Sequence, residues 1–304
     1  MRRSPFVLAA GLALTVASSC GGNADSASES SSITAVTTTT QVGDFARAVG
    51  GDRVSVKQIL PPNADPHDYE PRPSDILAIG DTAVAFVSGG DLDEPLGELI
   101  EGAEGDPKVV QLIDSVTAIE DGDPHWWHDP RNVIRAVATV RDELIAADPA
   151  GRDGYADNAA TYIDDLERLD RSIARCIERI PQEQRKLVTT HDALGYYADR
   201  YGLEVVGALI PSLSSQAQPS AKDTNDLVEQ IERLDVRAIF PESSLNPKLE
   251  EAVARETGAQ VGEALYADTL GPDGSPGATY LGSMEANTEA IAAGLGGPSV
   301  KCGF

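Results

Sequence analysis

The sequence has few basic residues, few aromatic residues and few histidines. Among its 304 residues, 24 lysines and arginines stand against 49 aspartates and glutamates, a formal net charge of −25 at pH 7. This shortage of cations excludes a nucleic-acid-binding protein, because such proteins neutralise phosphates with lysine and arginine. Aromatic residues make up 5% of the chain, so we expect buried surface to come mainly from Ala, Val, Ile and Leu. The 41% hydrophobic content is ample for folded cores, and the length predicts about two domains.

Several short motifs of catalysis and ion binding are also absent from the sequence. It has no HExxH pair, which a metalloprotease uses to hold zinc and supply a general base. Its glycine-rich stretches lack the Gly-Lys-Ser/Thr of a phosphate-binding loop. It has no calcium loop of alternating aspartates either, so we interpret the excess acid as solvated surface that keeps the protein soluble.

The N-terminus has the pattern of a bacterial lipoprotein signal. Residues 1–3 are basic at two positions, and residues 4–17 are apolar but too short to span a membrane. Small residues then precede Cys20, which predicts that residues 1–19 are removed and that Cys20 is lipidated. Residues 20–32, rich in Gly, Ser and Ala, read as a flexible tether. We therefore expect a soluble domain anchored by lipid to the outer face of the cell membrane; ordinary secretion with cleavage nearby is the alternative.

Two cysteines remain once Cys20 is assigned to the lipid. Cys176 and Cys302 form an even pair in a compartment expected to be oxidising, so we predict a disulfide between them. Sequence alone does not bring the two residues together in space.

Short runs rich in β-branched residues alternate with helix-like segments along the chain. Such alternation predicts an α/β fold with mostly parallel sheets flanked by helices. The expected strands are residues 33–40, 54–60, 84–88, 109–113, 187–190, 205–209, 238–241 and 260–267. The expected helices between them are residues 42–49, 74–79, 96–100, 131–147, 192–201, 221–234, 247–256 and 280–295.

The alternation is interrupted once, by residues 155–180. Apolar side chains recur there every three or four residues, which predicts one amphipathic helix of roughly 40 Å that ends at Pro181. We interpret this segment, residues 151–181, as a rigid helix that links two α/β lobes. The lobes would comprise residues 33–150 and residues 182–304.

The four histidines lie in turn-like segments next to acidic residues or prolines. Neutral imidazole is the commonest protein ligand of zinc and similar metals, so this shared setting predicts a metal site. In open parallel sheets, ligands bind beyond the carboxyl ends of the strands. Two facing lobes would bring three imidazoles and one carboxylate together, a nearly tetrahedral zinc site. The candidate ligands are His67, either His125 or His128, His191 and Asp268.

Four segments of the chain resemble, in order, the metal-binding lipoproteins of zinc and manganese ABC transporters, the cluster A-I solute-binding proteins. They are residues 123–130 (DPHWWHDP), 189–203 (TTHDALGYYADRYGL), 240–248 (FPESSLNPK) and 266–271 (YADTLG). The resemblance implies two α/β lobes joined by one long helix, with a metal held in the cleft between them. It also implies delivery of that metal to a membrane permease driven by a cytoplasmic ATPase.

The resemblance implies a role for each candidate residue. It implies that His125, not His128, occupies the ligand position of the Asp-Pro-His motif. Glu242 then lies behind the ligands, and His128 is either an imidazole behind the ligands or one at the surface; neither binds the metal. A third histidine, at the position of His191, is typical of zinc binders, whereas manganese binders tend to have a glutamate there. The implied metal ligands are His67, His125, His191 and Asp268, with zinc as the expected cargo and manganese as the alternative.

A binding protein that acts as a monomer is the leading hypothesis, and we do not expect an enzyme. The alternative from another class is a secreted zinc hydrolase, which needs an open metal position and a nearby carboxylate base. Glu242 or Asp129 would have to supply that base. A third alternative is an adhesin that uses the metal only for structure.

Overall fold

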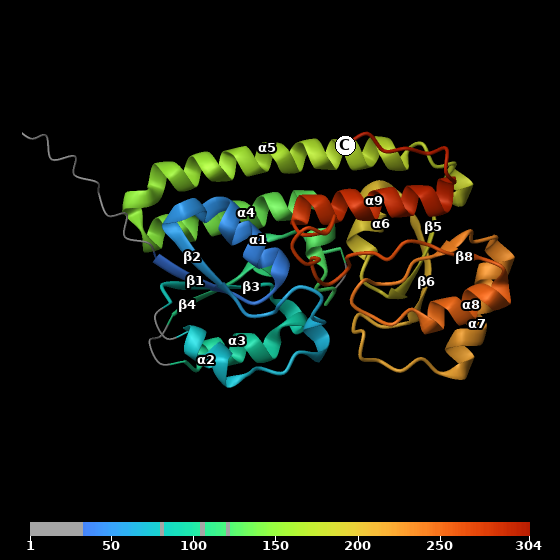
Figure 1. Ribbon diagram of the computed structural model, residues 1–304, viewed down its shortest axis with the longest axis horizontal. Coiled ribbons are helices and arrows are strands. Elements are labelled where there is room, and N and C mark those ends of the chain that lie inside the picture. The colour runs from blue at the N-terminus through green and yellow to red at the C-terminus, as the bar shows by residue number, and fades with distance from the viewer. Residues whose placement is uncertain (1–32, 80–81, 104–106, 120–121) are drawn as a thin grey trace, which may run out of the picture. The chain divides into compact units, whose positions relative to one another are not determined.

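Two sets of parallel strands, one from each half of the chain, form the framework of the fold (Figure 1). The computed structural model describes residues 33–79, 82–103, 107–119 and 122–304. The predicted signal segment at 1–19 and the predicted tether at 20–32, with Cys20, lie outside these residues. Within the described part of the chain, no helix is both long enough and apolar enough to cross a membrane.

The first lobe is built on a parallel sheet with the strand order β2-β1-β3-β4. Alternate residues of its central strands face opposite cores: Ala35 faces a core with α1 and α4, whereas Val36 faces a core with α2 and α3. The strands are β1 (Ile33–Thr37), β2 (Val54–Gln58), β3 (Val84–Val87) and β4 (Lys108–Gln111). The helices are α1 (Thr40–Gly50), α2 (Pro73–Ile79), α3 (Glu94–Glu101) and α4 (Pro130–Ala147).

The second lobe repeats this parallel arrangement, with two longer strands of 6 and 7 residues and two short strands of 2 residues each. Two parallel pairs, β5-β6 and β7-β8, are joined by a parallel bridge between Thr189 and Phe240. Val188 faces a core with α7 and α8, whereas Leu187 faces the core that contains α9. The strands are β5 (Lys186–His191), β6 (Glu204–Ile210), β7 (Ala238–Ile239) and β8 (Gln260–Val261). The helices are α6 (Gly195–Tyr201), α7 (Ala221–Leu234), α8 (Lys248–Thr257) and α9 (Tyr280–Gly296).

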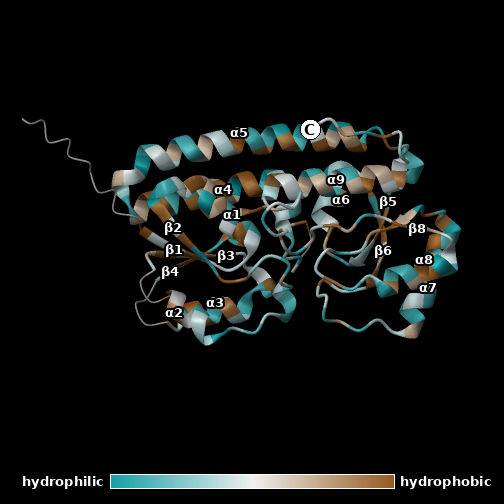
Figure 2. Cartoon of the chain, in the orientation of Figure 1, coloured by the Kyte–Doolittle hydropathy of each residue, from teal (hydrophilic) through white to brown (hydrophobic). Residues whose placement is uncertain are grey.

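One long helix, α5 (Arg152–Ile177), runs along both lobes (Figure 1). It contacts α1 and α4 of the first lobe and α6 and α9 of the second. Its 26 residues span about 39 Å at 1.5 Å per residue. Figure 2 shows hydrophilic and hydrophobic patches alternating along it, as expected for an amphipathic helix. The helix ends at Ile177, before the end expected at Pro181.

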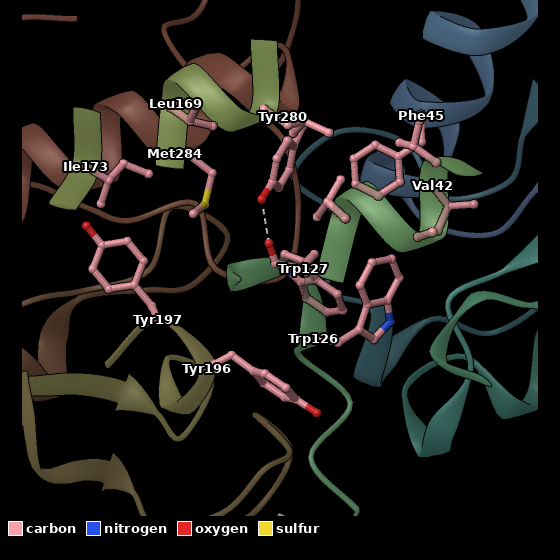
Figure 3. Packing of buried hydrophobic residues seen from close by; sticks show 14 of the residues in the cluster. Val42, Phe45, Trp126, Trp127, Leu169, Ile173, Tyr196, Tyr197, Tyr280 and Met284 are labelled. Atoms are coloured by element: carbon pink, nitrogen blue, oxygen red, sulfur yellow. Dashed lines mark hydrogen bonds between the residues drawn. The ribbon is translucent and has the colours of Figure 1, made fainter. Parts of the chain in front are cut away.

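The scarce aromatic residues are concentrated in the core that joins the lobes (Figure 3). The ring of Tyr280, on α9, packs edge-on against Phe45 of α1, with the ring centroids 5.1 Å apart. Such pairs contribute about 0.5–1.5 kcal/mol beyond the burial of their surface. The Tyr280 hydroxyl also donates to the carbonyl of Trp127 at 2.6 Å. Ala, Val, Ile and Leu still make up most of this core, as expected from the composition, and the aromatic rings are gathered where the lobes join.

A half-buried carboxylate reinforces the same junction. One oxygen of Asp44, on α1, accepts the backbone N–H of Tyr280 at 3.0 Å and the hydroxyl of Tyr162 at 3.2 Å. Three helices, α1, α5 and α9, are thereby joined through a single side chain. Burial raises the pKa of Asp44, although these hydrogen bonds and Arg47 act in the opposite direction.

Every strand and helix expected from the sequence has a counterpart in the described chain, with shifted ends. The first expected strand stops at Thr37, because the Thr39 side chain caps α1 by accepting the Val42 N–H at 3.4 Å. The strand expected at 260–267 is limited to Gln260–Val261, followed by an isolated bridge between Glu242 and Leu265.

A disulfide joins Cys176 to Cys302, with their Cα atoms 5.1 Å apart. It ties the last turn of α5 to the segment that follows α9, across 126 residues of sequence. The predicted pairing is therefore present.

Replacement of Cys302 by Ala should lower the free energy of unfolding by about 2–5 kcal/mol, because the unfolded chain loses its cross-link. Urea unfolding of the oxidised parent and of the variant measures the difference. The parent treated with a thiol reductant should match the untreated variant. Equal stability of the oxidised parent and the variant would contradict a stabilising role for the bridge.

Candidate metal centre

The predicted ligands meet where the carboxyl ends of the two sets of strands face each other. His67 lies in a short 3₁₀ helix, Pro66–Asp68, in the loop after β2. His125 directly precedes the 3₁₀ helix Trp126–His128 that leads into α4. His191 is the last residue of β5, and Asp268 follows the bridge at Leu265. The first lobe thus supplies two imidazoles, and the second supplies an imidazole and a carboxylate.

These side chains converge on one point. The Nε2 atom of His67 lies 3.4 Å from Oδ2 of Asp268, and Nε2 of His125 lies 3.4 Å from Oδ1. The Nε2 atom of His191 lies 3.3 Å both from Asp268 Oδ2 and from His125 Nε2. One donor atom from each of the four residues lies within 4.8 Å of all the others.

Four of the distances between donor atoms match the edge length of a tetrahedral zinc site. Zinc–nitrogen bonds of about 2.0–2.1 Å in a tetrahedron place neighbouring donors about 3.3–3.4 Å apart. The four measured distances around Asp268 and between His125 and His191 have these values. Both carboxylate oxygens face imidazole nitrogens, so Asp268 can offer one oxygen or two.

The donor atoms are buried, and three of them lack hydrogen-bond partners. The side chains of His125 and His191 are fully buried, that of Asp268 is 1% exposed and that of His67 is 7% exposed. The Nε2 atom of His67 and both oxygens of Asp268 have no partner within hydrogen-bonding geometry. Leaving three such atoms unsatisfied is costly unless a cation completes them. The donor set therefore fits a bound metal ion.

Carboxylates behind the ligands orient two of the imidazole rings. Asp123 Oδ1 lies 2.8 Å from Nδ1 of His125, and Glu242 Oε1 contacts Nδ1 of His191. These contacts hold the proton on Nδ1 and turn Nε2 towards the centre. Glu242 therefore lies behind His191 and outside the set of donor atoms.

Two copies of one tripeptide position candidate ligands, a role that was not predicted from the sequence. Asp-Pro-His occurs at residues 65–67 and 123–125, and in each copy the aspartate Oδ1 accepts the histidine N–H at 2.9 Å. This side-chain turn fixes the backbone of the ligand. Asp65 also accepts the hydroxyl of Ser215, from the second lobe, through its other oxygen at 2.6 Å. The repetition of the tripeptide is the sequence signal that could have identified Asp65 and Asp123.

The carboxylates also determine the charge of His191. Burial lowers its pKa, but Asp268 and Glu242 outweigh burial and raise the pKa to about 9. Burial opposes ionisation of Asp268, yet the imidazoles of His191 and His125 hold its pKa well below the ordinary value. Burial raises the pKa of Glu242, although His191 acts in the opposite direction. Without a metal, His191 is therefore an imidazolium between two carboxylates.

His128 lies apart from the donor set. It is 1% exposed, so it is not the surface imidazole that was one of its two expected roles. Its ring packs against Trp127 at 5.6 Å between centroids, and neither ring nitrogen has a hydrogen-bond partner. Burial, assisted by the charge of His125, lowers its pKa to about 3. His128 is thus a neutral side chain packed behind the site.

Comparison with known proteins gives matches along nearly the whole described chain. The family model described as zinc-uptake complex component A, periplasmic (ZnuA) matches residues 35–294. A manganese-binding lipoprotein, MntA, from Halalkalibacterium halodurans is 34% identical over 286 residues, covering 92% of this chain and 94% of the relative. The iron-binding protein YfeA of Yersinia pestis is 32% identical, covering 96% of this chain and 98% of the relative.

A solved structure has the same fold. The periplasmic zinc-binding protein TroA from Treponema pallidum superposes with a TM-score of 0.82 at 29% sequence identity. The match covers 87% of this chain and 99% of that protein.

Replacement of Asp123 by Ala should weaken metal binding by about 10- to 100-fold, because the His125 ring loses the carboxylate that orients it. Isothermal titration calorimetry measures the affinity. Asp199→Ala is the matched control, since Asp199 lines the same cavity as Asp123 but is exposed on α6. Equal affinities of the two variants would show that Asp123 does not orient the ligand.

Metal binding at pH 7.5 should release about one proton, because His191, with a pKa of about 9, must lose its proton to offer Nε2. Affinity should accordingly rise with pH up to about 9, a wider range than an ordinary histidine would give. Calorimetric titration in buffers of different ionisation enthalpy measures the protons released. A binding enthalpy that is the same in every buffer would rule this out.

Proposed function

Because the chain belongs to the ZnuA family of metal-binding, substrate-binding proteins of ABC transporters, we propose that it captures zinc outside the cell membrane and delivers it to the transporter's permease. The observation that carries the proposal is the buried cluster of three imidazoles and one carboxylate with the donor spacing of a metal polyhedron. Its four ligands are His67, His125, His191 and Asp268.

The donor set favours zinc over manganese. Three imidazole nitrogens suit zinc, whereas manganese prefers oxygen donors and binds a given nitrogen-rich site more weakly. The names of the relatives do not choose between metals, since they specify manganese, iron and zinc. Manganese is the second candidate, because Asp268 can contribute both of its unpartnered oxygens and so enlarge the coordination shell.

The site is better suited to holding cargo than to hydrolysis. Members of this family are solute-binding proteins, not enzymes. Both carboxylates considered as general bases are engaged elsewhere: Glu242 holds His191, and Asp129 caps α4 while pairing with Arg131 at 2.7 Å. Four protein ligands also leave no position at which zinc would activate water.

Attachment to the membrane completes the proposal. Cys20 would carry the lipid, and residues 20–32 would let the folded part reach the permease while it remains anchored. The protein would act as a monomer at the outer face of the membrane. Metabolic labelling with a radioactive fatty acid tests the anchor, since Cys20→Ala should abolish incorporation.

Calorimetric titration of the chelator-stripped protein with zinc and with manganese tests the metal site. We expect one site that binds zinc more tightly than manganese, and His67→Ala should weaken zinc binding by at least about 100-fold. His128→Leu is the matched control, because it replaces a buried, unpartnered imidazole and should retain affinity. Unchanged binding in His67→Ala, or loss of binding in His128→Leu alone, would overturn the ligand assignment. Tighter binding of manganese would transfer the proposal to that metal.

A further inference from the structure

A cavity of about 390 Å³ adjoins the metal centre at His67. One wall is the loop that carries Pro66 and His67, and another is the start of α3 with the turn before it. Residues 212–214, from the second lobe, form the third wall. A water molecule occupies about 30 Å³ in the liquid, so the cavity has room for an ion with its hydration shell.

The cavity reaches the centre through one ligand. Of the four donor side chains, His67 alone is among the described residues that line it. His67 is also the most exposed of the four, at 7%, and its Nε2 atom has no hydrogen-bond partner. An ion in this cavity would therefore reach the side chain of His67 before it met the other three ligands.

Two exposed carboxylates stand along the cavity, Asp91 and Glu94, at the start of α3. Both also line a neighbouring cavity of about 390 Å³, together with Glu98 and Glu101. No lysine or arginine is among the described residues that line either cavity. One cation, Arg72, stacks on Tyr69 of the cavity wall with 5.5 Å between its guanidinium carbon and the ring centroid. The charged side chains that line the two cavities are acidic, which concentrates divalent cations there.

We infer that this cavity is the route by which the metal ion enters and leaves the site, and that Asp91 and Glu94 accelerate its passage to His67. This inference rests on the proposed function, since it concerns the path of the same metal. The two carboxylates attract the hydrated ion and stabilise it while it exchanges water for imidazole. Charges at the rim of a site act mainly on association rates and on their salt dependence.

Stopped-flow mixing of zinc chloride with the chelator-stripped protein tests the route. The fluorescence of Trp127, whose ring lies 5.5 Å from that of His125, gives one signal, and a chromogenic zinc indicator gives a second. The variant Asp91→Asn/Glu94→Gln should associate about five- to tenfold more slowly at low ionic strength. At 0.5 M salt, the difference should shrink to less than about twofold. Dissociation should slow in parallel, so the Kd should stay within about threefold of the parent value.

Asp164→Asn/Glu167→Gln is the matched control. It removes the same two charges from exposed positions of α5, which lies across the molecule from α3 (Figure 1). The control should associate at the parent rate. Equal rates for the two double variants would overturn the inference, as would a large rise in Kd without slower association. Absence of zinc binding by the parent would instead refute the proposed function.

Discussion

The fold depends on one shared hydrophobic core that holds both lobes against α5. Each lobe also has a core of its own on the opposite face of its strands. The shared core contains residues of both lobes, from Ala35 in β1 to Leu295 in α9. Asp44 adds hydrogen bonds across the same junction. This continuous packing keeps the carboxyl ends of two separate sets of strands facing each other, which is where all four ligands begin.

The metal centre then follows from electrostatics within that frame. Asp268 is a buried carboxylate with no hydrogen-bond donor, and its ionised form is sustained by the imidazoles around it. A bound cation would stabilise the ionised carboxylate in their place. Asp123 and Glu242 stand behind two of the rings, so the negative charge of the centre exceeds what the ligands alone supply. This excess favours a divalent cation over a proton.

Most of the fold could be predicted from periodicity, because most of the strands and helices are long enough to show their pattern. The shortest strands were the least predictable: β8 pairs over only two residues, and its length is set by tertiary contacts and not by propensity. The burial of His128 had no sequence signal, since it depends on the packing of Trp127 against the site.

Only part of the candidate site could be predicted from the sequence, because the rest depends on tertiary contacts. The residues themselves identified His67, His191 and Asp268 as candidate ligands. Only the resemblance to a family distinguished His125 from His128. Tertiary packing places the first in the donor set and the second against Trp127, which a linear pattern does not reveal. The contact of Asp65 with Ser215 joins residues 150 apart, and no local signal predicts such a pair.

That contact has a consequence for how tightly the protein holds its cargo. One carboxylate, Asp65, fixes the backbone of a ligand from the first lobe and accepts a hydroxyl from the second. Formation of this contact between the lobes and occupation of the site are therefore thermodynamically linked. If a bound ion stabilises the contact by a given free energy, the contact increases the free energy of ion binding by the same amount. A permease that separated Ser215 from Asp65 would loosen the ion without touching any atom that binds it.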